Sequence, residues 1–206
     1  MKLEIVKISP KRRGRGSIRL KSYDYSQAGG YFVTICTHQR ECLLGEIMDG
    51  NVELSKIGKI AQECWFEIPK HFGDVQLDEF VVMPNHVYGI IIINQRISVG
   101  TDYNLSLRRQ NRFRNVIVKS LSYIVAGFKS GVTRKINRSR NISHPLAWQS
   151  RFYDHIIRNE AELNRIREYI ITNPLKWELD RENPFSTNYN LELKRYFDGI
   201  YVTKIH

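Results

Sequence analysis

Two apolar stretches separated by only two residues constrain the fold more than any other feature of the sequence. Residues 75–83 and 86–93 are rich in β-branched and aromatic side chains, as is typical of strands, and only Pro84 and Asn85 join them. A parallel pair needs a crossover of a dozen or more residues, so these strands must form an antiparallel hairpin. The second strand is apolar on both faces, which predicts a central strand that is covered on both sides.

Strands and helices alternate along the rest of the chain. Further strands, identified by β-branched and aromatic side chains, are predicted over residues 31–37, over 43–52 and within 147–157. The second of these closes at a turn signal, Asp49-Gly50-Asn51. Helices, identified by apolar side chains at helical spacing, are predicted over residues 55–67, 116–132 and 159–172. Polar connections are predicted over residues 94–115 and 134–143. This order, together with the hairpin, predicts an α+β fold in which helices pack on an antiparallel sheet in a ferredoxin-like manner.

The charge of the chain favours a polyanionic partner. Lysine and arginine number 32 against 21 acidic residues, which gives a formal net charge of +11. Much of the surplus of positive charge lies in two runs of the sequence. In the first run we expect contacts with nucleic-acid phosphates from Arg12, Arg13, Arg15, Arg19 and Lys21. In the second run we expect them from Arg108, Arg109 and Arg112. The second run continues through Arg134 and Arg138. Neither run forms a stripe opposite a strongly apolar face, so a membrane surface is the weaker interpretation.

The domain organisation predicted from the sequence is simple. We expect a basic N-terminal arm over residues 1–28, one catalytic domain over 29–177 and a C-terminal extension over 178–206. The longest apolar stretch is too short to cross a bilayer, and the first residues contain no apolar segment of a secretory signal. Three cysteines in no paired spacing indicate free thiols, so we expect a cytoplasmic protein.

Two pairs of side chains are candidates for chemistry. His86 and Tyr88 are two apart in a predicted strand and therefore share a face, where a pair of histidines would make a metal site. Tyr169 and Asn173 are four apart in the last predicted helix and lie on one flank beside its apolar stripe. Taken singly, each of these residues has an ordinary structural interpretation as well, in packing or at a helix end.

Several motifs together resemble the tyrosine transposases of the IS200 type and their REP-associated relatives, the single-strand transposases with an HUH motif. Residues 83–89, Met-Pro-Asn-His-Val-Tyr-Gly, look like that family's metal-binding strand. Residues 148–155 and 169–174, the latter Tyr-Ile-Ile-Thr-Asn-Pro, resemble its C-terminal signature, and residues 31–37 and 77–80 match in order as well. The resemblance covers roughly residues 29–177.

The resemblance implies a function and a role for each candidate. Tyr169 would be the nucleophile, and His86 and Asn173 would bind Mg²⁺ or Mn²⁺. The activity would be cleavage and rejoining of single-stranded or hairpin DNA through a 5′-phosphotyrosine intermediate, in a bacterial or archaeal cell. IS200-like transposases pair as homodimers, whereas REP-associated relatives act alone, and the sequence leaves this open.

Tyr88 departs from the family pattern, which has a second histidine at this place. Three outcomes are open: a weak site through His86, Asn173 and Tyr88 or waters; substitution by another side chain such as His38 or His155; or an inactive site. The alternative function is therefore a catalytically weakened or inactive DNA-hairpin-binding protein of the same fold. A third interpretation, an RNA-binding ferredoxin-like module, lacks the expected aromatic motif.

Overall fold

A computed structural model describes residues 23–94, 120–139 and 148–186 of the 206-residue chain. Its centre is a four-stranded antiparallel sheet with the order β4-β5-β1-β6. The strands are β1 (Gly29–Cys36), β4 (Val75–Met83), β5 (His86–Ile93) and β6 (Tyr153–Ile157). With helices after the first and third of these strands, this order is the ferredoxin-like arrangement, so the predicted fold class is confirmed.

The predicted hairpin forms at the Pro84–Asn85 turn, where Met83 of β4 pairs with His86 of β5. Both of its boundaries agree with the sequence analysis because the apolar runs end where the turn residues begin. Strand β5 lies between β4 and β1, and its side chains are buried at almost every position. The prediction of a central strand covered on both faces is therefore confirmed.

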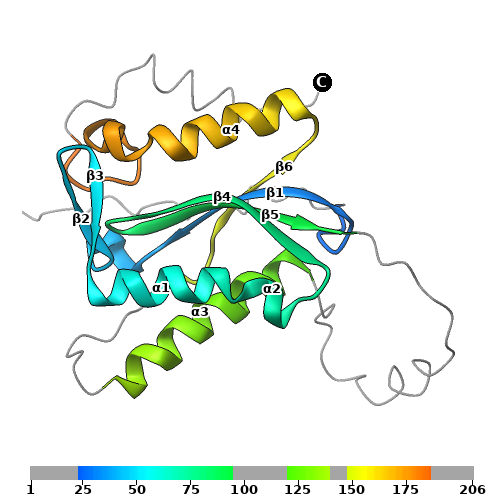
Figure 1. Ribbon diagram of the computed structural model, residues 1–206, viewed down its shortest axis with the longest axis horizontal. Helices are drawn as coiled ribbons and strands as arrows, with labels where there is room; N and C mark the ends of the chain where they lie inside the picture. Colours follow the sequence, from blue (N-terminus) through cyan, green and yellow to red (C-terminus); the bar gives the residue numbers. More distant parts are fainter. Residues whose placement is uncertain (1–22, 95–119, 140–147, 187–206) are drawn as a thin grey trace, which may run out of the picture.

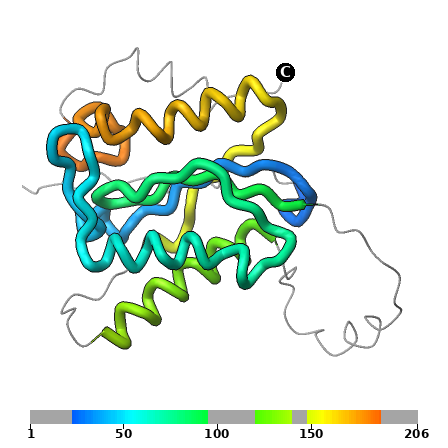
Figure 2. The backbone as a smooth tube through the Cα atoms, viewed as in Figure 1, coloured from blue at the N-terminus to red at the C-terminus, as the bar shows by residue number. Residues whose placement is uncertain are grey.

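Helices cover both faces of the sheet (Figure 1). On one face lie α1 (Lys56–Phe66), the short α2 (Ile68–His71) and α3 (Leu121–Arg138). On the other lies α4 (Glu160–Thr172), which continues into the 3₁₀ helix η3 (Pro174–Leu179). The hairpin of β2 (Gly45–Met48) and β3 (Asn51–Leu54) stands beside η3 (Figure 2), and a short 3₁₀ turn, η1 (His38–Arg40), follows β1.

Capping side chains fix where two of the helices start. The hydroxyl of Ser55 accepts a hydrogen bond from the backbone N–H of Gly58 at 3.1 Å, which begins α1 as predicted. Oδ1 of Asn159 accepts from the N–H of Glu162 at 2.9 Å at the start of α4. The carboxylate of Glu162 accepts from the N–H of Arg158, one residue before the cap, and so satisfies another exposed donor.

The alternation of side chains along β5 decides what lies on each face. Val87 and Ile91 belong to the core beneath α1 and α3. Tyr88 and Ile90 belong to a second core against α4, together with Tyr169. The indole of Trp65 on α1 packs directly on Gly89, where a Cβ atom would lie 2.2 Å from the ring. This alternation places the motif residues of β5 on the face that α4 covers.

Two predicted elements differ from the structure. The single strand predicted over residues 43–52 is a hairpin of two strands, because Asp49 and Gly50 take φ values of 50° and 75° and turn the chain back. Helix α3 continues to Arg138, through residues predicted to be a polar connection, because the buried Ile136 extends its apolar stripe beyond Val132. The N-terminal part of the helix predicted over residues 116–132 and most of the connection over 94–115 lie outside the described residues. None of the helices in the described segments is long and apolar enough to cross a membrane.

Candidate functional site

Four aromatic rings meet where the start of β5 faces the last turns of α4. The ring of Tyr88 lies with its centroid 4.2 Å from that of His86 and 5.2 Å from that of Tyr169. Phe32 of β1 stacks on Tyr88 at 5.6 Å and meets Tyr169 edge-on at 6.0 Å. The tyrosine proposed as nucleophile from sequence and the strand motif are thus brought together, and both are buried, Tyr169 being only 2% exposed.

The proton on His86 is fixed by its neighbour Asn85. The side-chain amide of Asn85 donates to the carbonyl oxygens of Arg40 at 3.1 Å and Glu182 at 2.8 Å. Its Oδ1 therefore faces Nδ1 of His86, at 2.7 Å, and can only accept. Nδ1 must carry the proton, which leaves a lone pair on Nε2. Burial lowers the pKa of His86 to about 3, so the ring is neutral at physiological pH.

Asp180 is the carboxylate of this site, and it follows η3 directly. The hydroxyl of Tyr88 donates to its Oδ2 at 3.1 Å, and the N–H of Glu182 donates to Oδ1 at 2.6 Å. Asp180 is 1% exposed, and burial raises its pKa above the ordinary value. The hydrogen bonds from Glu182, Asn173 and Tyr88 offset only part of that rise.

Asn173 caps the C-terminus of α4 and reaches the same carboxylate. Its side-chain amide lies near enough to Asp180 to lower the pKa of that carboxyl, and the residue is 1% exposed. Two buried acceptor atoms, Oδ1 of Asn173 and Nε2 of His86, find no hydrogen-bond partner among the described residues. An unsatisfied buried polar atom is costly, so such atoms point to a missing partner.

Asp180 and Glu182 are site residues that the sequence did not predict, and they fall in the range predicted to be a C-terminal extension. Glu182 is buried and pairs with Arg40 at 2.7 Å and Arg181 at 3.0 Å. A carboxylate just after a helix is usually solvated, and nothing in its spacing relates it to His86. The only available signal is weak: two acids within three residues, after a segment that contains Trp177.

The two histidines considered as substitute ligands lie elsewhere. Nε2 of His155, on β6, is 2.8 Å from the carboxylate of Glu162 at the N-terminal end of α4, the end opposite Asn173. His38 is exposed on η1. In the described part of the chain no three His, Cys, Asp or Glu side chains gather in a way that could hold a metal ion. A cation site here would therefore need the amide oxygen of Asn173.

The side chains that are present fit a divalent cation of the Mg²⁺ or Mn²⁺ type. An imidazole lone pair, an amide oxygen and a carboxylate are donors that such ions accept. Nε2 of His86 and Oδ1 of Asn173 are both acceptors, so a cation satisfies these two atoms where an anion would not. Tyr88 is different, because its hydroxyl is engaged as a donor to Asp180.

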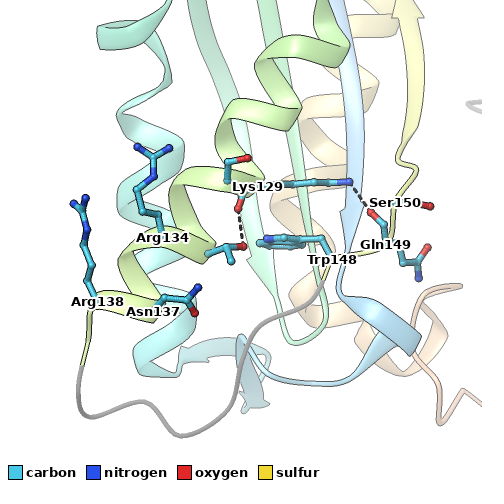
Figure 3. A pocket seen from close by; sticks show the side chains of 9 residues that line it. Lys129, Arg134, Asn137, Arg138, Trp148, Gln149 and Ser150 are labelled. Carbon is cyan, nitrogen blue, oxygen red and sulfur yellow. Dashed lines mark hydrogen bonds between the residues drawn. The ribbon is translucent and has the colours of Figure 1, made fainter.

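A basic groove lies on α3, on the other side of the sheet (Figure 3). Its volume is about 570 Å³, and its lining includes Lys129, Arg134, Arg138, Trp148 and Gln149. The ammonium of Lys129 donates to the carbonyl oxygen of Gln149 at 2.7 Å and so ties α3 to the segment before β6. The DNA contacts predicted from sequence, Arg12, Arg13, Arg15, Arg19, Lys21, Arg108, Arg109 and Arg112, all lie outside the described residues.

Fold and site together define an α+β protein that buries a tyrosine, a histidine and a carboxylate in one polar cluster between sheet and helix. No family model matches the chain. A protein of Haemophilus influenzae (strain ATCC 51907 / DSM 11121 / KW20 / Rd), described only as uncharacterized, is 40% identical over 167 residues. The match covers 81% of this chain and 92% of that protein, and the two belong to one family.

Two solved structures are similar to the chain at a lower level. The REP-associated tyrosine transposase bound to a REP hairpin is 18% identical and aligns over 73% of this chain and 69% of its own, with a TM-score of 0.49. A protein from Deinococcus radiodurans R1 described as a candidate transposase is 14% identical over 74% of this chain and 96% of its own, with a TM-score of 0.37. At these scores neither likeness bears on the activity of the chain.

Proposed function

We propose that this chain is a single-stranded DNA nickase and transposase with Tyr169 as its nucleophile. The observation that carries the proposal is the placement of Tyr169 against the strand motif, with its ring 5.2 Å from that of Tyr88. The motif resemblance assigned these residues to one site from sequence, and the fold brings them together from β5 and α4.

The proposed reaction conserves the bond energy of the cleaved DNA phosphodiester in a phosphotyrosine bond. The phenol oxygen of Tyr169 attacks a phosphodiester phosphorus and forms a 5′-phosphotyrosine, while the bond to the 3′ oxygen breaks and that oxygen takes up a proton. The reverse attack by a 3′-hydroxyl rejoins a strand. A free phenol has a pKa of about 10, so its attack at neutral pH needs help at the phosphate.

That help would come from a divalent cation, which neutralises charge on the phosphate oxygens and polarises phosphorus. His86 and Asn173 would hold it through Nε2 and Oδ1, two buried acceptor atoms for which the described part of the chain offers no hydrogen-bond partner. The protein's own contribution is orientation, because Asn85 fixes the ring of His86 and the end of α4 fixes Asn173.

The described part of the chain also offers a surface for DNA. Arg134 and Arg138 lie one helical turn apart on α3 and line the basic groove together with Trp148. Arginines neutralise phosphates, and an indole ring can stack on an unpaired base. We propose that this groove adds to the basic runs of the sequence in binding single-stranded or hairpin DNA.

A second function is favoured by two specific observations. Tyr88 stands where the family pattern has a histidine, and Tyr169 is only 2% exposed, so DNA cleavage requires the residues around it to move. Both facts suit a hairpin-binding protein that keeps the fold while cleaving slowly or not at all.

The two functions are separated by incubating the full chain with a labelled single-stranded hairpin and Mn²⁺. A nickase leaves a protein–DNA adduct that survives a denaturing gel, whereas a binding protein shifts the hairpin only on a native gel. A matched duplex without a single-stranded part is the control substrate, and neither activity is expected on it.

A further inference from the structure

The cluster around Asp180 has the composition of a cation site in which the motif's second ligand has been replaced. Nε2 of His86 and Oδ1 of Asn173 are buried acceptors without partners among the described residues. The hydroxyl of Tyr88, whose ring packs on His86, donates to the carboxylate of Asp180 at 3.1 Å, and the amide of Asn173 lies near enough to lower the pKa of that carboxyl. Asp180 therefore lies beside Asn173 and is linked to His86 through Tyr88.

A cation suits this cluster better than a water molecule does. A water can donate to two acceptors, but it leaves the charge of a buried carboxylate in place. A divalent ion satisfies the same acceptors and offsets that charge. Oδ1 of Asp180 accepts from Glu182 and Oδ2 from Tyr88, and even with the amide of Asn173 beside the same carboxylate a lone pair is left for a cation.

We propose that Asp180 supplies the ligand that a second histidine would have supplied, and that Tyr88 positions Asp180 without binding the cation itself. A neutral phenol is a weak ligand, but it is a good hydrogen-bond donor to a ligating carboxylate. The exchange of histidine for tyrosine at position 88 is then compensated by a residue 92 positions further along the chain. The inference rests on the proposed function only in its choice of cation, Mg²⁺ or Mn²⁺.

The test is a Mn²⁺ titration of the full chain without DNA, followed by the electron paramagnetic resonance signal of the free ion. Asp180→Asn should weaken Mn²⁺ binding by more than about 10-fold, and Tyr88→Phe by less than Asp180→Asn does. Glu178→Gln is the matched control, because it removes an exposed carboxylate two residues before Asp180, and it should leave Mn²⁺ affinity unchanged.

A second measurement needs no substitution at Asp180 and so holds even if Asp180→Asn fails to fold. With Mn²⁺ bound to the wild-type chain labelled with ¹³C-aspartate, pulsed resonance should show carboxylate ¹³C coupling together with ¹⁴N coupling from imidazole. The proposal is overturned by a wild-type chain that binds no Mn²⁺ at millimolar concentration, by ¹⁴N coupling without ¹³C coupling, or by a folded Asp180→Asn variant with wild-type affinity.

Failure of this proposal and failure of the proposed function give different results. If the chain forms DNA adducts but binds Mn²⁺ without Asp180, only the assignment of Asp180 as a ligand is wrong. If the chain binds Mn²⁺ through Asp180 but forms no adduct, the cation site is confirmed and the proposed nickase activity is wrong.

Discussion

Arg167 of α4 donates two hydrogen bonds to the carboxylate of Asp78 on β4, from Nε to Oδ1 at 2.8 Å and from Nη2 to Oδ2 at 2.7 Å. The pair fastens the helix to the sheet two residues before Tyr169. The position of the proposed nucleophile against β5 therefore depends on this contact as well as on the apolar packing beneath α4.

The pair predicts a specific pH dependence of stability. The hydrogen bonds from Arg167 lower the pKa of Asp78 below its ordinary value of 3.8, against the opposing effect of burial. A lowered folded-state pKa gives stability that is present above pH 3.8 and is lost as the pH falls through the folded-state value. Asp78→Asn should thus cost at most about 1 kcal/mol at pH 7, since the pair is partly exposed.

Urea unfolding of wild type and Asp78→Asn from pH 7 down to pH 2.5 checks this expectation. The difference in the free energy of unfolding should shrink once the pH drops below about 4, where the unfolded chain takes up a proton at Asp78. A difference that stays constant over this range would show that the two hydrogen bonds do not depend on the charge of Asp78.

The contact of Trp65 with Gly89 predicts that one methyl group added at position 89 lowers the stability of the fold. A Cβ at position 89 would lie 2.2 Å from the indole, so Gly89→Ala must displace Trp65 or bend β5. We expect a loss of about 1–3 kcal/mol in the free energy of unfolding. Gly73→Ala is the control, because a Cβ there meets no atom within 4 Å, and its effect should stay within about 0.5 kcal/mol.

The basic groove predicts how DNA affinity responds to salt. Replacing Arg134 or Arg138 by alanine should weaken hairpin binding and reduce the slope of log affinity against log salt by about 1 for each phosphate that is no longer neutralised. Lys135→Ala is the matched control on the same helix, because Lys135 already pairs with Glu67 at 2.9 Å. Equal effects of all three substitutions would indicate that only net charge matters and that the groove is no binding site.

Much of the fold can be predicted from the sequence, because the strongest sequence signals each lie within a short segment of the chain. The short Pro84–Asn85 connection dictates the central hairpin, and the caps Ser55 and Asn159 fix the starts of two helices. The end of α3 could not be predicted in the same way, because the charged residues at 134, 135 and 138 mask the buried Ile136 among them.

The site follows from the sequence only in part. Spacing correctly places His86 and Tyr88 on one face of β5, and the fold brings Tyr169 to that face, while the roles of these residues stay predictions. Asp180 could not be predicted, since its contact with Tyr88 joins residues 92 positions apart through a turn after η3. No local periodicity encodes such a contact.

The role of Tyr169 as nucleophile is tested by comparing covalent adduct formation by wild type and by Tyr169→Phe on the same hairpin DNA. The substitution removes one hydroxyl from a buried ring, so folding and DNA affinity should change little. Tyr153→Phe on β6 is the matched control, because it removes the same group from another tyrosine beside the same core. We predict an adduct with wild type and Tyr153→Phe and none with Tyr169→Phe. An adduct that persists in Tyr169→Phe at the wild-type rate would contradict the assignment of Tyr169 as the nucleophile.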